Sequence, residues 1–316
     1  MLNSAFLTFS ILPHSFRLIP NESKSSLIEV ASNIWTIEAK EHVCYRPPMQ
    51  PRYPYTHRAV VIRLNDNSLF IISPIRLTSD IRAEIDALGA VKYLVSPNHL
   101  HHLYLGDWSQ AYPDARIYAS PRLASKRKDL TFDKTLTTNI PEPEWSGQID
   151  QCIFGSGNGW IDEIVFFDHA SRTIIFSDLV MDFDPATFSS FARVTTRWNQ
   201  MYQHTPRGVQ LGHIFDRATL RDSLKMIQSW EAEHAIVAHS PWLCVDGKEQ
   251  VAAFVTAAFD WLTPQPAIVE AVMGVGRLLM LLLVVLPIHT LLVLIVDGVY
   301  ERFVKRGKAN SSFSSI

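Results

Sequence analysis

Three histidines stand within four positions of this sequence, in the stretch VSPNHLHHLYLGDW at residues 95–108. They follow a short apolar run, and imidazole nitrogens are common ligands of zinc, iron and manganese. A carboxylate and a further histidine also follow apolar runs directly, after TIIFS and after AIVA. The candidate metal ligands are therefore His99, His101, His102, Asp178 and His239.

Each of these residues also has a purely structural interpretation. The histidines of residues 99–102 could bond loop carbonyls or cap the next helix, and Asp178 could accept N–H groups from the following turn. His239 precedes a Ser-Pro turn. Three ligands with an open position would suit one catalytic zinc, which lowers the pKa of its bound water to about 7. The expected cofactor is therefore one zinc, iron or manganese ion, or no metal at all.

Other chemistries find less support in the sequence. It contains no Gly-x-Ser-x-Gly elbow and no P-loop, and GSGNG at 155–159 precedes a predicted strand rather than a helix. A net charge of −2 argues against a broad nucleic-acid surface. Cys44, Cys152 and Cys244 lie far apart, which predicts neither a disulfide framework nor a cysteine-paired zinc. We expect a small-molecule substrate of unknown type and no nucleic acid.

Strands and helices alternate between residues 27 and 245. The runs HRAVVIRL and SLFIISPI flank Asn65-Asp66-Asn67 and predict a hairpin, and LTSDIRAEIDALGA predicts a helix that Gly89 ends. VKYLV predicts a buried strand, DEIVFFDHASRTIIFSD a strand–turn–strand, DRATLRDSLKMIQSWEAE a helix and HAIVAHS a closing strand. This alternation predicts a layered α/β fold with a mixed sheet, in which sites lie at strand ends.

The C-terminal region contains an uncharged, leucine-rich run, LLMLLLVVLPIHTLLVLIV, at residues 278–296. As a helix it would span about 28 Å, close to the hydrocarbon thickness of a bilayer. Basic residues follow it at 302, 305, 306 and 308, which places that end on the cytoplasmic side. We expect a single-pass membrane protein with the lipid bilayer as partner. A tail anchor with a cytosolic domain and a helix lying in the interface are alternatives.

Four stretches carry a resemblance to a known family: NIWTIEA, VIRLNDNSLFIISPIRLTSDIRAEIDALGAVKYLVSPNHLHHL, DEIVFFDHASRTIIFSDLV and AIVAHS. Together they resemble the metallo-β-lactamase superfamily, and most closely its branch DUF4336. The resemblance implies a four-layer αββα sandwich. The predicted organisation is a flexible tail (1–26), a metallo-β-lactamase-like domain (27–262), a linker (263–277), the transmembrane helix (278–296) and a basic, serine-rich tail (297–316).

The superfamily's first metal motif, His-x-His-x-Asp-His followed closely by glycine, is only partly matched. With the glycine on Gly106, its four ligand positions fall on Asn98, Leu100, His102 and Leu103. Sliding by one residue matches His99 and His101, but Leu103 and Tyr104 then take the remaining places. A further expected histidine falls on Gly159, whereas the bridging aspartate matches Asp178 and the last histidine His239. The resemblance therefore implies at most a mononuclear site.

Two functions from different classes follow from this pattern. The first is a membrane-anchored, metal-dependent hydrolase of an ester, thioester or phosphoester. The second is a non-catalytic pseudoenzyme, a membrane-associated binding or scaffold module that kept the fold. They differ in whether the histidine and aspartate side chains converge on one point, within the about 2–2.2 Å ligand distance of zinc.

Overall fold

The computed structural model describes residues 16–18, 27–39, 43–45, 53–55, 57–155, 161–213, 217–264 and 275. The helices and strands named below lie in one compact unit, residues 1–45 and 52–263. A second unit, residues 46–51 and 264–316, lies almost entirely outside the described residues. The architecture is therefore that of the first unit.

One sheet has seven strands in the order β10-β9-β8-β7-β6-β3-β2. Its β2–β3–β6–β7 part is antiparallel and its β7–β8–β9–β10 part is parallel. Helices α1, α2 and α3 lie in the three crossovers that connect these parallel strands. The bounds are β2 (Leu27–Ala31), β3 (Ile34–Glu38), β6 (Arg58–Arg63), β7 (Ser68–Ile72), α1 (Ser79–Leu88), β8 (Ala90–Val95), α2 (Leu105–Ala111), β9 (Arg116–Ala119), α3 (Leu123–Lys126) and β10 (Lys134–Thr135).

The other large sheet has six strands in the order β1-β15-β14-β13-β12-β11. Only β13 and β14 pair in parallel, and α6 lies in the crossover between them. The bounds are β1 (Phe16–Leu18), β11 (Ile149–Ile153), β12 (Ile164–Asp168), β13 (Thr173–Phe176), α6 (Arg217–Ser229), β14 (His234–Val237), β15 (Trp242–Asp246) and α7 (Lys248–Ala258). The remaining elements are a small sheet of β4 (Val43–Tyr45) and β5 (Tyr53–Tyr55), two 3-10 turns (Pro185–Thr187, Asp260–Leu262), α4 (Ser190–Trp198) and α5 (Arg207–Gly212).

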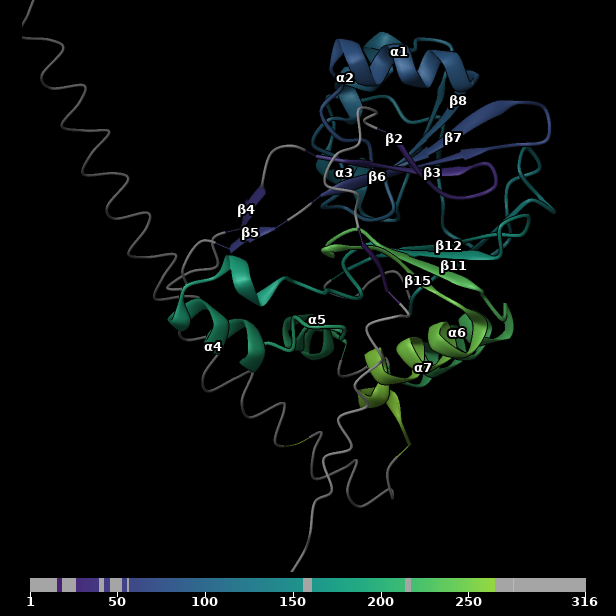
Figure 1. Ribbon diagram of the computed structural model, residues 1–316. Helices are drawn as coiled ribbons and strands as arrows, with labels where there is room; N and C mark the ends of the chain where they lie inside the picture. The colour runs from purple at the N-terminus through teal and green to yellow at the C-terminus, as the bar shows by residue number, and fades with distance from the viewer. Residues whose placement is uncertain are drawn as a thin grey trace, which may run out of the picture. The chain divides into compact units, whose positions relative to one another are not determined.

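Three apolar clusters hold the sheets and helices together as four layers. Strand β7 shows the reason: Phe70 and Ile72 point into the cluster between the two sheets, whereas Leu69 and Ile71 face the cluster that includes Ile85 of α1. Such a strand is buried on both faces and is therefore apolar throughout. A third cluster lies between the six-stranded sheet and helices α6 and α7. Figure 1 shows α1 and α2 outside one sheet and α6 and α7 outside the other.

Much of the predicted secondary structure is confirmed. The hairpin β6–β7 turns at Asn65-Asp66-Asn67, where the Asp66 carboxylate accepts the Ser68 N–H at 2.9 Å. Helix α1 begins at the Thr78 cap, whose hydroxyl accepts the Ile81 N–H at 3.3 Å. Gly89 ends it where no other residue fits, because a Cβ there would lie 2.2 Å from the Asn67 carbonyl oxygen. The strands expected in VKYLV, DEIVFFDHASRTIIFSD and HAIVAHS are β8, β12–β13 and β14.

Three features differ from the sequence-based expectation. The chain does not close with β14, because WLCVD forms β15 beside it. Residues 16–18 of the predicted flexible tail form β1, which pairs with β15. The expected loop at 128–147 contributes the short strand β10. The hydrophobic run 278–296 and the basic tail after it lie outside the described residues. Within the part of the chain that is described, no helix has the length and apolar character to cross a bilayer.

Arg58 joins the two large sheets from the start of β6. Its side chain is fully buried, and its guanidinium donates to the carbonyl oxygens of Ser240 at 3.0 Å, Trp242 at 2.8 Å and Leu243 at 3.0 Å. It also pairs with Glu38 on the neighbouring strand, at 2.9 Å between Nε and Oε1. The five donors of a guanidinium suit such a fan of acceptors. This residue therefore fixes β6 against the turn that precedes β15.

Replacing Arg58 with alanine should strongly destabilise the fold. The substitution removes one partner of a buried ion pair and the donor to three carbonyl groups, so the free energy of unfolding should fall by about 3–5 kcal/mol. Urea denaturation of the full chain, followed by circular dichroism, measures it. Lys92→Ala is the matched control: its pair with Asp66 is about half exposed, so removing it should change the free energy of unfolding far less. Equal losses in both variants would contradict the role of Arg58.

Candidate metal centre

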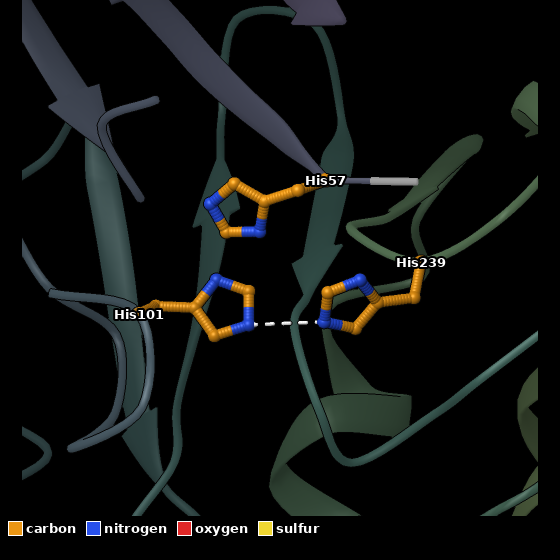
Figure 2. Close-up of side chains that lie close together, drawn as sticks. All are labelled: His57, His101 and His239. Atoms are coloured by element: carbon orange, nitrogen blue, oxygen red, sulfur yellow. Dashed lines mark hydrogen bonds between the residues drawn. The ribbon is translucent and has the colours of Figure 1, made fainter. Parts of the chain in front are cut away.

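Three buried imidazoles converge where the ends of strands from both sheets meet. His57 precedes β6, His101 lies in the loop between β8 and α2, and His239 follows β14. One ring nitrogen from each lies within 4.8 Å of the others, and the side chains are 2–7% exposed. Figure 2 shows the three rings turned toward a common point, with His101 Nε2 and His239 Nε2 3.2 Å apart. Three imidazole nitrogens clustered in this way are candidate ligands for one metal ion.

Asp178 adds a carboxylate to this cluster. It lies two residues beyond the end of β13, and its Oδ1 is 3.0 Å from His239 Nε2 while its Oδ2 is 3.2 Å from His101 Nε2. Burial alone would raise the pKa of this carboxyl group. The charges and hydrogen bonds of His101 and His239 nevertheless hold the pKa of Asp178 well below its ordinary value. Asp178 is therefore ionised and supplies a negative charge at the cluster.

His57 is held toward its neutral form. Burial, and then the proximity of His101 and His239, holds the pKa of His57 well below its ordinary value. Its ring centroid is 4.8 Å from that of His101 and 5.8 Å from that of His239. A neutral imidazole carries a nitrogen lone pair, which is the form that binds metals.

Ser73 sets the orientation of His101. The serine follows β7 in a left-handed backbone conformation with φ of 57°, and its Oγ lies 2.5 Å from His101 Nδ1. A partner on Nδ1 fixes which way the ring faces and leaves Nε2 directed at Asp178 and His239. Metal-binding histidines commonly have such a partner on their second ring nitrogen.

Asn98 and Glu163 support the cluster from one side. The Asn98 Oδ1 accepts the N–H groups of Leu100 and His101, and its Nδ2 donates to Asp178 at 2.8 Å and to Glu163 at 3.1 Å. Glu163 also accepts three successive backbone N–H groups, from residues 177, 178 and 179, at 2.6–3.1 Å. Burial, and then the charge of Asp178, raises the pKa of Glu163 to about 8. The pair therefore fixes both the His101 loop and the turn that carries Asp178.

The other two histidines of the NHLHH stretch have partners elsewhere. His99 bonds through Nδ1 to the buried carboxylate of Asp162, which also accepts the His99 N–H at 3.1 Å. Arg127 donates to the Nδ1 and the carbonyl oxygen of His102, both at 2.9 Å. Burial, and then Lys126 and Arg127, lowers the pKa of His102 to about 4. The structure therefore brings together His101, Asp178 and His239 of the five predicted ligands and leaves His99 and His102 outside the cluster.

The donor set fits one tetrahedral ion. Bonds of about 2.0–2.1 Å to zinc would separate neighbouring ligand atoms by about 3.3 Å. His101 Nε2 and His239 Nε2 are 3.2 Å apart, and each is also close to one oxygen of Asp178, Oδ2 at 3.2 Å and Oδ1 at 3.0 Å respectively. His57 lies farther away: the three imidazoles span up to 4.8 Å, beyond the about 4.2 Å that two such bonds allow. Among the described residues, no second group of three such side chains is found. The geometry therefore suits a mononuclear site held by His101, His239 and Asp178, which His57 would reach only after a shift of its side chain.

His57 was absent from the sequence-based set because it precedes a strand rather than following one. Strand β6 runs antiparallel to β7, so its first residues lie at the edge where β7 ends. A histidine that leads directly into the buried run RAVVIR was the available signal. The rule that sites follow the carboxyl ends of parallel strands does not apply to such a residue.

The fold is metallo-β-lactamase-like. The family model described as "Domain of unknown function (DUF4336)" matches residues 32–204, more than half of the chain, and the chain belongs to this family. The DUF4336 branch expected from the sequence is thereby confirmed, and so is the metallo-β-lactamase-like fold.

Solved structures share the fold at low sequence identity. Rubredoxin oxygen:oxidoreductase from Desulfovibrio gigas is 11% identical with a TM-score of 0.52, over 76% of this chain and 62% of that one. The DIM-1 metallo-β-lactamase exposed to ceftazidime is 17% identical with a TM-score of 0.48, over 73% and 96%. The mono-zinc form of FIM-1 from Pseudomonas aeruginosa is 11% identical with a TM-score of 0.46, over 78% and 99%. No curated protein matches the sequence.

Truncating Glu163 should weaken both the fold and the cluster. Glu163→Ala leaves three N–H groups and the Asn98 amide without their buried acceptor, and each such loss costs about 1–3 kcal/mol. We expect the free energy of unfolding to fall by about 3 kcal/mol or more in urea denaturation. Glu163→Gln keeps one acceptor oxygen and should lose less. An alanine variant as stable as the parent protein would show that these hydrogen bonds do not support the turn.

Proposed function

We propose that this chain is a membrane-anchored, metal-dependent hydrolase with a mononuclear site. The observation that carries the proposal is the convergence of His57, His101 and His239 within 4.8 Å, buried and next to the Asp178 carboxylate. Esters, thioesters and phosphoesters are the proposed substrate class. Imidazole and carboxylate donors suit zinc, iron or manganese, and zinc is the metal we propose first.

Each residue of the cluster would have a distinct role in the proposed hydrolysis. The three histidines would hold the ion, which when bound supplies a water with a pKa near about 7 and polarises the substrate oxygen. Ser73 and Asn98 keep His101 oriented. Asp178 is ionised and hydrogen-bonded on both oxygens, so it would serve as a further donor to the ion or as the group that takes a proton from water.

Membrane attachment is the second part of the proposal. It is supported by the uncharged run at residues 278–296 and the basic residues that follow it. We propose that this run forms a single membrane span. Extraction with alkaline carbonate, which releases peripheral proteins, tests it: the full chain should stay in the pellet.

Burial of the cluster favours a second candidate function. The four side chains are 2–7% exposed, whereas a catalytic ion needs a position open to substrate. Four protein donors and no open position are typical of a structural metal site. The alternative is therefore a non-catalytic, membrane-associated binding or scaffold module.

Metal content distinguishes the histidine cluster from a chance arrangement. Full-length protein purified without chelator should contain about one zinc, iron or manganese ion per chain by mass spectrometry. Alanine substitution of His57, His101 or His239 should abolish retention of the ion. Ser73→Ala should weaken affinity by about 10–100-fold, the usual effect of removing a hydrogen-bond partner of a ligand.

The control for this experiment is His169→Ala, which removes an exposed histidine paired with Asp150 and far from the cluster in the sheet. It should leave metal content unchanged. A folded parent protein without metal at saturating zinc would contradict the metal site altogether. Loss of metal in His99→Ala but not in His57→Ala would show that His99, and not His57, is a ligand, and would contradict the assignment proposed here.

Turnover separates the hydrolase from the scaffold. Metal-loaded protein should hydrolyse at least one of a set of chromogenic esters, thioesters and phosphoesters. Asp178→Asn should lower kcat by about 10²–10⁴-fold if the carboxylate moves a proton in the reaction. Metal bound stoichiometrically with no turnover across the three bond types would favour the non-catalytic module.

A further inference from the structure

Helix α4 exposes three large apolar side chains on one face. Phe191, Val194 and Trp198 are 63%, 67% and 55% exposed. Their spacing of three and four residues places them together along one side of the helix. An apolar stripe of this size on a surface helix is a common mark of an interaction site.

Helix α4 has a separate buried face, so the exposed apolar side chains are not the face that packs on the core. Ala192 and Thr196 form the buried face, and the helix packs there against Phe183, Phe188 and Tyr202. Ser189 caps the start of α4 by accepting the Ala192 N–H at 3.3 Å. The Arg207 N–H donates to the Asn199 carbonyl at 2.9 Å and so links α4 to α5. Figure 1 shows these two helices next to each other. The helix thus has its own core contacts, and the exposed face is additional to them.

The surroundings of the stripe are basic. Arg193 and Arg197 are exposed on the flank of α4, and the Arg207 guanidinium lies 5.6 Å from the centre of the Trp198 ring. The sequence from residue 185 to 215 contains no aspartate or glutamate. The surface therefore combines apolar side chains, a tryptophan and nearby arginines.

We propose that this face of α4 docks onto a lipid bilayer with anionic headgroups. A helix with an aromatic and aliphatic face flanked by arginines lies in the interface plane of such membranes. Tryptophan favours the headgroup level, and arginines near an anionic surface each contribute to binding. The inference rests on the membrane location in the proposed function, which the run at 278–296 supports independently. It adds an orientation: the domain lies against the bilayer through α4.

Fluorescence of Trp198 in the full chain tests the docking. Trp198→Phe removes one of eight tryptophans, so the difference between the two proteins isolates the emission of that side chain. In vesicles of phosphatidylcholine and phosphatidylglycerol, the Trp198 emission should shift to shorter wavelength and be quenched by brominated acyl chains. Phe191→Ser combined with Val194→Ser should abolish most of the quenching.

Charge and position provide the matched controls. Arg193→Gln with Arg197→Gln should reduce the docked-to-undocked ratio about 30-fold at low salt, since each arginine contributes about fivefold near an anionic surface. The same variant should behave like the parent in pure phosphatidylcholine. Ile140→Ser removes another exposed apolar side chain, which is 74% exposed and lies off α4, and should change nothing.

Sedimentation with the vesicles distinguishes docking from anchoring. A chain that sediments while Trp198 stays unquenched retains its anchor and overturns the docking proposal. A chain that is quenched yet released by alkaline carbonate supports docking and contradicts the anchor. If Trp198 is instead shielded without lipid, in proportion to protein concentration, a second copy covers the face and the proposal is wrong.

Discussion

The buried guanidinium of Arg58 is the interaction on which the candidate site depends. It lies at the start of β6 in one sheet and donates to carbonyls at residues 240, 242 and 243 in the other. His57 and His239 are the residues next to the two ends of this link. Because a single side chain makes all three hydrogen bonds, it holds the two histidines, which come from different sheets, at a fixed separation. The packing of apolar side chains alone would bring the sheets together without specifying that register.

The cluster also solves an electrostatic problem within the fold. A buried carboxylate needs compensating donors, and Asp178 receives them from Asn98, His101 and His239. Glu163, which is equally buried and lies close by, is held toward its neutral form, with its pKa raised to about 8. Asp178 therefore keeps its negative charge, whereas Glu163 is held toward its neutral form. A cation at the imidazoles would face a single carboxylate, which suits one ion better than two.

The sequence predicted the layers of the fold well and the site only in part. Asp178 and His239 could be identified because each follows a buried strand closely. Within NHLHH, spacing could not select His101, since the direction of each ring depends on distant partners: Asp162 takes His99 and Arg127 takes His102. His57 required the antiparallel pairing of β6 with β7, which is a property of the assembled sheet.

The excursion between β3 and β6 is closed at its base. The Ala39 N–H donates to the His57 carbonyl at 2.8 Å, directly beyond the Glu38–Arg58 pairing of the two strands. His57 is therefore positioned by the ladder of the sheet, and not by the path of the chain from residue 40 to 56. Lengthening a loop whose ends are already paired adds only a slowly growing entropic cost. Insertions between residues 40 and 56 should therefore cost little free energy while His57 keeps its position in the sheet.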